Sequence, residues 1–317
     1  MVKYIIKRII QIIPMLFAIS IICFFIIKMA PGSPIKMYER PGMNYHQVEI
    51  IRHNLGLDKP IIVQYFYWLK NVLKGNLGYS LISGSKVIDE IGIRLIPSLI
   101  LSIISIILTF LFGIILGIIG GKNKGNKKGK IIDILSSISI ATPSFLIALI
   151  LIIIFTVELN LLPNIGMYDV GDKSILGLIV HLIMPVTAMV LSDIGGIIQY
   201  VKGYVEIEME KDYVKTSLGR GLSKEKVFYK HVLKNSILPV ITLIGMSLPN
   251  VVMGSVVIEQ IFAWPGVGRL AYNAATGFDY PTIMAITMFG SILLILGNLI
   301  SDILYFIVDP RIKGGLK

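Results

Sequence analysis

Six long stretches of the chain contain no charged residue, and each is at least 19 residues long. A helix needs about 20 apolar residues to cross a bilayer core roughly 30 Å thick. Backbone polar groups find no water in that core, so they must be paired within the segment. The runs lack the alternation over about 10 residues that marks membrane β-strands. With their flanks, the predicted membrane helices are residues 9–29, 95–121, 131–157, 174–200, 236–258 and 281–308.

Lys and Arg are distributed unevenly between these helices. There are three before the first helix, five in 122–130, eight in 202–234 and three after the last helix, which makes 19 of the 30. The two short loops on the opposite side hold only Lys173 and Arg269. Cytoplasmic loops are enriched in Lys and Arg, whereas long loops translocate largely regardless of charge. We therefore predict that both termini are cytoplasmic. The predicted loops are a cytoplasmic one at 202–235 and extracytoplasmic ones at 30–94 and 259–280.

The composition supports a membrane protein. Hydrophobic residues make up 55% of the chain and charged residues 15%, and the mean hydropathy is +0.79. Soluble domains carry about 25% charged residues, so a soluble globular protein and a disordered chain are both excluded. The net charge of +11 would suggest nucleic acid in a soluble protein. In a membrane protein cytoplasmic basic loops explain it, so we expect lipid as a partner and no nucleic acid.

Motifs for catalysis and cofactor binding are absent from the sequence. It has no G-x-x-x-x-G-K-[ST] loop to cradle phosphates, no H-E-x-x-H and no C-x-x-C. Cys23 is the only cysteine, and His181 has no second histidine at ligand spacing. We expect no bound cofactor or metal and no enzymatic activity. Transport or a receptor role is favoured, with a secondary transporter and an integral membrane enzyme kept as alternatives of other classes.

Three glycines spaced by four lie in the second predicted helix, at Gly113, Gly117 and Gly121. Small residues on one helix face let a neighbouring helix approach closely. This spacing predicts helix packing and no chemistry.

The loop at 202–235 is patterned more strongly than a simple connection requires. Apolar or small residues recur every four positions from Val205 to Ser217, which indicates a helix. Gly221 follows as a helix-ending residue, and Ser223 is a good N-cap for a second helix. The pattern fits either an amphipathic segment at the lipid surface or a docking element for a soluble partner.

The loop at 259–280 carries large aromatic residues around a Pro-Gly-Val-Gly turn. One interpretation is anchoring at the membrane surface, where aromatic residues gather. The other is that Glu259–Asp279 folds back as a short re-entrant helix and gates a cavity or contacts a partner, which requires burial in protein or a water-lined cavity. The candidate gate or contact residues are Phe262, Trp264, Pro265, Gly266 and Gly268.

Several segments together resemble a known family. The stretch DYVKTSLGRGLSKEKVFYKHVLKNSILPVIT, which begins at Asp212, is similar to the cytoplasmic coupling loop of ABC importer permeases. It keeps the small pair Thr216-Ser217 and Gly221 of the family's E-A-A pattern, while Leu218 and Gly219 replace a basic residue and Ala. Further matches are found in residues 4–34, 55–81, 141–145, 259–270, 278–281 and 298–313. The chain is identified as a member of the dipeptide, oligopeptide and nickel branch, and resembles the first of its two permeases.

The resemblance implies an all-α membrane protein with the type I ABC importer permease fold, in a prokaryotic cell membrane. It implies four kinds of partner: a second homologous permease, two ATP-binding subunits, an extracytoplasmic solute-binding protein and a peptide substrate. ATP and Mg²⁺ would bind the partner subunits, and a nickel chelate is the alternative substrate. The implied ATPase-coupling residues are Asp212, Tyr213, Thr216, Ser217, Arg220, Gly221 and Leu222.

Overall fold

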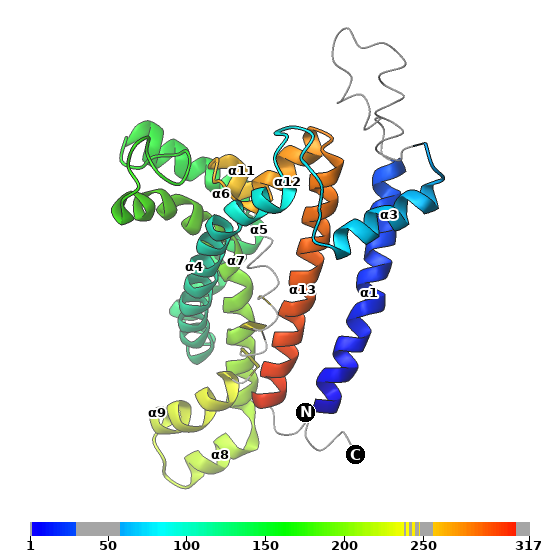
Figure 1. Cartoon of the computed structure of the whole chain (residues 1–317). Coiled ribbons are helices and arrows are strands. Elements are labelled where there is room, and N and C mark those ends of the chain that lie inside the picture. Colours follow the sequence, from blue (N-terminus) through cyan, green and yellow to red (C-terminus); the bar gives the residue numbers. More distant parts are fainter. Residues whose placement is uncertain are drawn as a thin grey trace. The chain divides into compact units, whose positions relative to one another are not determined.

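The computed structural model describes residues 2–29, 58–237, 239–240, 243–244, 247 and 256–308. Apart from one bridge between Tyr79 and Lys86, these residues form helices, turns and loops (Figure 1). The helices are α1 (Val2–Met29), α3 (Ile61–Leu73), α4 (Val87–Lys122), α5 (Lys127–Ala141), α6 (Ser144–Leu151), α7 (Ile175–Glu210), α8 (Asp212–Gly219), α9 (Lys224–Val227), α11 (Val256–Ile261), α12 (Val267–Thr276) and α13 (Tyr280–Val308), with π-helical turns η2 (Ile152–Glu158) and η3 (Phe228–Val232).

Four of these helices are long and apolar enough to cross a membrane, namely α1, α4, α7 and α13. The pair formed by α5 and α6–η2 would provide a fifth span among the described residues. The predicted helix at 236–258 lies mostly outside the described residues, and so do residues 30–57 of the predicted extracytoplasmic segment at 30–94. A total of six spans therefore stays a prediction.

The predicted helix at 131–157 is broken into two helices that meet at 99°. The break falls at Thr142, whose φ and ψ of −97° and 117° are extended, and at Pro143, which precedes α6. Proline has no N–H to donate and disfavours the helical conformation in the residue before it. The uncharged run is continuous through this point, which is why hydropathy alone predicted one helix.

Three helices extend well beyond their predicted ends. α1 begins at Val2 rather than at residue 9. α4 begins at Val87 rather than at residue 95, and acidic Asp89 and Glu90 lie in its first turn, where the helix dipole favours negative charge. α7 continues to Glu210, ten residues beyond the predicted end at 200. Charged residues predict the start of a loop, but at these ends they continue the same helix.

The chain forms two compact units, which are described separately. The first comprises residues 1–96 and 266–295. In it, α3 packs on α1 through Tyr65, whose hydroxyl lies 2.8 Å from Ser20 Oγ. Phe24 and Met284 complete this small apolar cluster. Asp279 caps the start of α13, since its buried carboxylate accepts hydrogen bonds from Thr282 and from Ser80.

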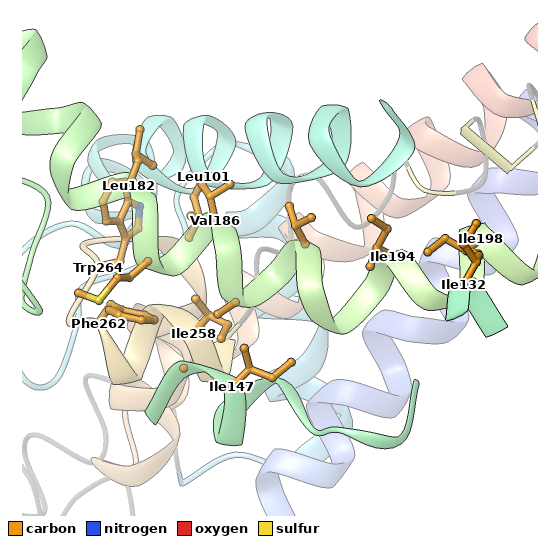
Figure 2. Close-up of a cluster of buried hydrophobic side chains, with 14 residues drawn as sticks. Leu101, Ile132, Ile147, Leu182, Val186, Ile194, Ile198, Ile258, Phe262 and Trp264 are labelled. Atoms are coloured by element: carbon orange, nitrogen blue, oxygen red, sulfur yellow. The ribbon is translucent and has the colours of Figure 1, made fainter. Parts of the chain in front are cut away.

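The second unit comprises residues 97–265 and 296–317. Its main apolar cluster brings together α4, α6, α7 and α11, as Figure 2 shows for Leu101, Ile147, Leu182 and Ile258. α5 packs on α7 through polar groups as well, because Gly195 N donates to Ser139 Oγ at 2.9 Å. The core of this unit therefore runs along α7.

The predicted glycine face of α4 packs against α7. A Cβ added at Gly113 would lie 2.7 Å from an Ile197 methyl, and one at Gly117 would lie 2.6 Å from Val201 Cβ. One at Gly121 would lie 2.7 Å from Val205 Cβ. Real Cβ atoms do not approach other atoms so closely. The close approach predicted from the glycine spacing is confirmed.

We predict that Gly117→Ala destabilises the protein. The new methyl meets Val201 and the backbone oxygen of Ile198, which lies 2.9 Å away. Overpacking costs about 1–3 kcal/mol, which exceeds the roughly 0.5–1 kcal/mol that Ala gains over Gly in a helix. The midpoint of thermal unfolding in detergent should therefore fall. Gly196→Ala is the matched control, because a Cβ added at Gly196 has no neighbour within 4 Å. The midpoint of this variant should stay the same or rise. Equal midpoints for both variants would contradict the packing.

Candidate functional site

The loop predicted at 202–235 folds into two short helices around a glycine bend. Lys211 has an extended ψ of 149°, which ends α7 and starts α8. α8 ends at Gly219, and Gly221 follows with φ of +82°, a conformation that side chains with a Cβ rarely adopt. Ser223 accepts a hydrogen bond from Lys226 N and caps α9. The predicted bend at Gly221 and the predicted cap at Ser223 are both present.

This coupling segment, residues 211–232, is attached to the rest of the unit by an apolar core. Val214 of α8 and Val227 and Phe228 of the α9–η3 region are buried. They pack in one cluster with Val205 of α7 and Phe110 of α4. In Figure 1, α8 and α9 lie at one end of α7. α8 therefore shares one apolar core with α7 and α4.

A polar contact fixes the junction between α7 and α8. Glu208 is buried, accepts a hydrogen bond from Tyr213 Oη at 2.7 Å and pairs with Lys211. Asn235 Nδ2 donates to the same tyrosine oxygen at 3.3 Å. Burial raises the pKa of Tyr213, and the Glu208 carboxylate raises it further. Tyr213 is therefore neutral at physiological pH, and its hydroxyl donates a hydrogen bond to Glu208.

The seven predicted coupling residues divide into two groups. Tyr213, Ser217 and Leu222 are half-buried, and Ser217 Oγ donates to the Tyr213 carbonyl at 2.7 Å, so these residues support the segment internally. The other four present their surface to solvent. These exposed residues are Asp212, Thr216, Arg220 and Gly221.

The last residue of α4 and the loop that follows it contact the coupling segment and its flank, which sequence reasoning missed. Lys122 Nζ lies 2.8 Å from Glu225 Oε2. Lys124 Nζ lies 3.0 Å from Glu210 Oε1 and 3.2 Å from Glu206 Oε2. From the sequence alone, the basic residues on this side were related to lipid. The available signal was that both loops were predicted on the same side of the membrane, and that the 202–235 loop holds five acidic residues beside its eight basic ones.

The predicted gate segment is also two helices rather than one re-entrant helix. α11 ends at Ile261, a turn follows, and α12 begins at Val267. Ala263 in the turn has φ of +49°. Gly266 has an extended conformation and precedes α12, so the turn cannot continue either helix.

Trp264 anchors this turn inside the second unit. Its side chain is fully buried, and its Nε1 donates to the Pro97 carbonyl at 3.0 Å (Figure 2 shows its place in the core). Glu259 is also fully buried, and it accepts a hydrogen bond from Ser98 Oγ at 2.7 Å. Phe262 O accepts from Gly166 N at 2.8 Å. The turn is therefore bound to Pro97 and Ser98 of α4 and to the loop before α7.

The burial of these aromatic residues corrects one interpretation and limits another. Phe262 and Trp264 do not anchor the protein in lipid, because they are 1% and 0% exposed within the protein core. For the same reason neither presents a surface to a partner protein in this conformation. Pro265 is half-buried and Gly266 and Gly268 are buried. A gating role for the segment stays a prediction.

Among the described residues, no group of three or more His, Cys, Asp or Glu side chains is placed to hold a metal ion. His181 is buried, and its Nδ1 lies 2.8 Å from the Gly177 carbonyl. Its Nε2 lies 3.6 Å from Asp169 Oδ1. Its hydrogen bond to Gly177 therefore stays within α7, and Nε2 has no hydrogen-bond partner among the described residues.

Comparison with known proteins identifies the family of this chain. Residues 113–314 match the profile of the binding-protein-dependent transport system inner membrane component, and residues 1–95 match that of its N-terminal domain. The oligopeptide transport system permease protein AppB of Bacillus subtilis is 38% identical over 99% of this chain and 100% of its own length. The glutathione transport system permease protein GsiC of Escherichia coli is 32% identical over 99% of both chains.

A solved structure supports the fold. A chain of the inward-facing MetNI methionine ABC transporter superposes with a TM-score of 0.55 at 14% identity, covering 69% of this chain and 96% of that one. An identity this low supports the fold alone. Because the family profile covers well over half of the residues, the chain belongs to the binding-protein-dependent transport system inner membrane components, the permease subunits of ABC importers.

Proposed function

We propose that this permease forms half of the pathway by which an ATP-driven importer takes up peptides. The observation that carries the proposal is the near full-length similarity to an oligopeptide permease and a glutathione permease. Glutathione is itself a short peptide, so both named substrates share peptide chemistry. A nickel chelate is the alternative substrate, and neither of the two relatives is named for nickel transport.

The partners follow from what the chain lacks and from its family. Family membership implies a solute-binding protein and ATP-binding subunits in general. The sequence has no loop that could cradle the phosphates of ATP, so hydrolysis resides on the ATP-binding subunits. We propose that the membrane partner is a second, non-identical permease, and that two ATP-binding subunits and one extracytoplasmic binding protein complete the complex.

We further propose that α8 is the element that docks on an ATP-binding subunit. Its exposed residues offer a surface of both charges and a bare backbone at Gly221. Its buried face is packed against α7 and α4, so a partner that moves α8 also moves two membrane helices. ATP can shift the equilibrium between inward-facing and outward-facing states only through different contacts in the two states. The α8 surface supplies a place for such contacts.

The proposed topology has six spans with both termini in the cytoplasm. Contacts in the second unit support its sidedness. Loops predicted on one side meet, as at Lys122 and Glu225, and loops predicted on the other side also meet, as at Gly166 and Phe262. We assign the first group to the cytoplasm because of its Lys and Arg content. On this assignment the turn anchored by Trp264 is at the external end and acts as the gate.

The assembled complex should accumulate labelled peptide in vesicles when its binding protein and ATP are present. The isolated permease should hydrolyse no ATP, because it lacks the phosphate-binding loop. Phosphate release by the permease alone and by the complex is the measurement, and nickel-chelate uptake is the competing assay. ATP turnover by the isolated chain at the rate of the complex would overturn the subunit assignment. Uptake of the nickel chelate without uptake of peptide would show that the substrate is the chelate and not a peptide.

Membrane sidedness is tested with single cysteines in a Cys23→Ser background. Asn126 and Asp172 are exposed residues in loops predicted on opposite sides. A membrane-impermeant thiol reagent added to intact cells should label Asp172→Cys and spare Asn126→Cys. Labelling of both variants after cell lysis controls for a difference in the reactivity of the two cysteines. The reverse pattern would invert the topology.

Gly221→Val should uncouple ATP hydrolysis from uptake, because a residue with a Cβ in the left-handed conformation costs about 1–2 kcal/mol and a β-branched one is a genuine outlier there. Gly219→Val is the matched control: both positions have open space around an added Cβ, and only Gly221 has positive φ. Membrane insertion should be normal in both variants. Peptide taken up per ATP should fall for Gly221→Val alone. If the two variants behave alike, the bend is not required for coupling.

A further inference from the structure

The last residue of α4 and the short loop that follows it touch the polypeptide on both sides of α8. Lys124 pairs with Glu206 and Glu210 near the end of α7, just before α8 begins. Lys122 pairs with Glu225 in α9, just after α8 and its bend. Two lysines that are separated in sequence by a single residue therefore contact both flanks of one short helix.

The contact of Lys122 is more than a solvated ion pair. Its Nζ lies 5.2 Å from the centre of the Phe228 ring and 4.9 Å from that of Tyr229, and it is 3.5 Å from Tyr229 Oη. Aromatic faces attract cations within about 6 Å. Phe228 is itself buried in the core that carries α8 and α9. Lys122 is thus joined to the coupling segment by charge and by ring contact.

The contact of Lys124 is part of a network. Glu206 is shared by Lys124 at 3.2 Å and by Lys202 at 3.5 Å, and Lys202 also pairs with Asp133 of α5. The hydrogen bond that Lys124 donates to Glu210, followed by the one to Glu206, holds the pKa of Lys124 above its ordinary value. The hydrogen bond that Lys122 donates to Glu225 has the same effect on the pKa of Lys122. Both lysines are therefore charged throughout the physiological range.

We propose that Lys122 and Lys124 form a clasp that ties both flanks of α8 to the end of α4 and to the loop between α4 and α5. The clasp passes movement of α8 to the cytoplasmic ends of α4 and α5 as well as to α7. It makes the two lysines positioning residues for coupling, in addition to the exposed α8 surface. This inference rests on the proposed coupling role of α8.

The ion pairs of the clasp connect α8 to a helix that the apolar core does not reach. The apolar core joins α8 to α7 and α4, but α5 contributes no residue to that cluster. α5 begins at Lys127, three residues after Lys124, so a force on Lys124 reaches it through very little chain. Without the ion pairs, α8 would act on α5 only indirectly, through the packing of α5 on α7.

The test removes the two charges in the complete reconstituted complex. Lys122→Gln with Lys124→Gln keeps most of each side chain and deletes both charges. Exposed ion pairs contribute little individually, so loss of the three pairs should lower peptide taken up per ATP about three- to ten-fold. Lys122→Arg with Lys124→Arg keeps the charges and should retain coupling within about two-fold.

Lys127→Gln with Lys128→Gln is the matched control. These lysines follow in the same basic run, and within the described part of the chain no ion pair involves them. The control should couple normally. Lys122→Gln and Glu225→Gln should also be non-additive when combined, because each removes the same contact. The thermal midpoint of each complex confirms that it is assembled.

Three outcomes overturn the clasp. The first is normal coupling in the Lys122→Gln/Lys124→Gln complex while Gly221→Val is uncoupled, which leaves the role of α8 standing. The second is equal loss in the test and control pairs that varies with the anionic lipid content of the vesicles, which assigns the lysines to lipid headgroups. The third is full additivity of Lys122→Gln and Glu225→Gln.

Discussion

The close approach of α4 and α7 at Gly113, Gly117 and Gly121 is the contact on which the second unit depends. In a bilayer, lipid tails are as apolar as leucine, so helices associate through packing rather than through the hydrophobic effect. Glycine permits that packing because it removes the side chain where the two backbones meet. The contact ends at Gly121, next to Lys122 and Lys124. It therefore also brings these two lysines within reach of the acidic residues on α7 and α9.

The length of α7 extends this arrangement from one end of the unit to the other. Its 36 residues correspond to about 54 Å at 1.5 Å per residue, which exceeds the bilayer core. Near its start it packs on α11 and the turn anchored by Trp264, and near its end it packs on α8. One helix thus contacts both the proposed gate and the proposed coupling segment. An alternating-access mechanism needs such a connection.

Much of the fold could be predicted because it is encoded locally. Glycines four apart give the packing face of α4, and Gly221 gives the bend after α8. What could not be predicted depends on contacts distant in sequence. α7 stays helical past residue 200 because Val201 and Val205 pack on α4, and Trp264 is buried because Pro97 accepts its N–H. The break at Pro143 did have a local signal, but an uninterrupted apolar run obscured it.

The ion pairs of Lys122 and Lys124 constrain how this protein can be recombined with its relatives. Glu206, Glu210 and Glu225 reside in one stretch of sequence, and Lys122 and Lys124 reside in another about 80 to 100 residues earlier. A chimera that replaces only the later stretch keeps the two lysines and puts their acidic partners at risk. The two stretches therefore have to be exchanged together, although only one of them contains the proposed coupling helix α8.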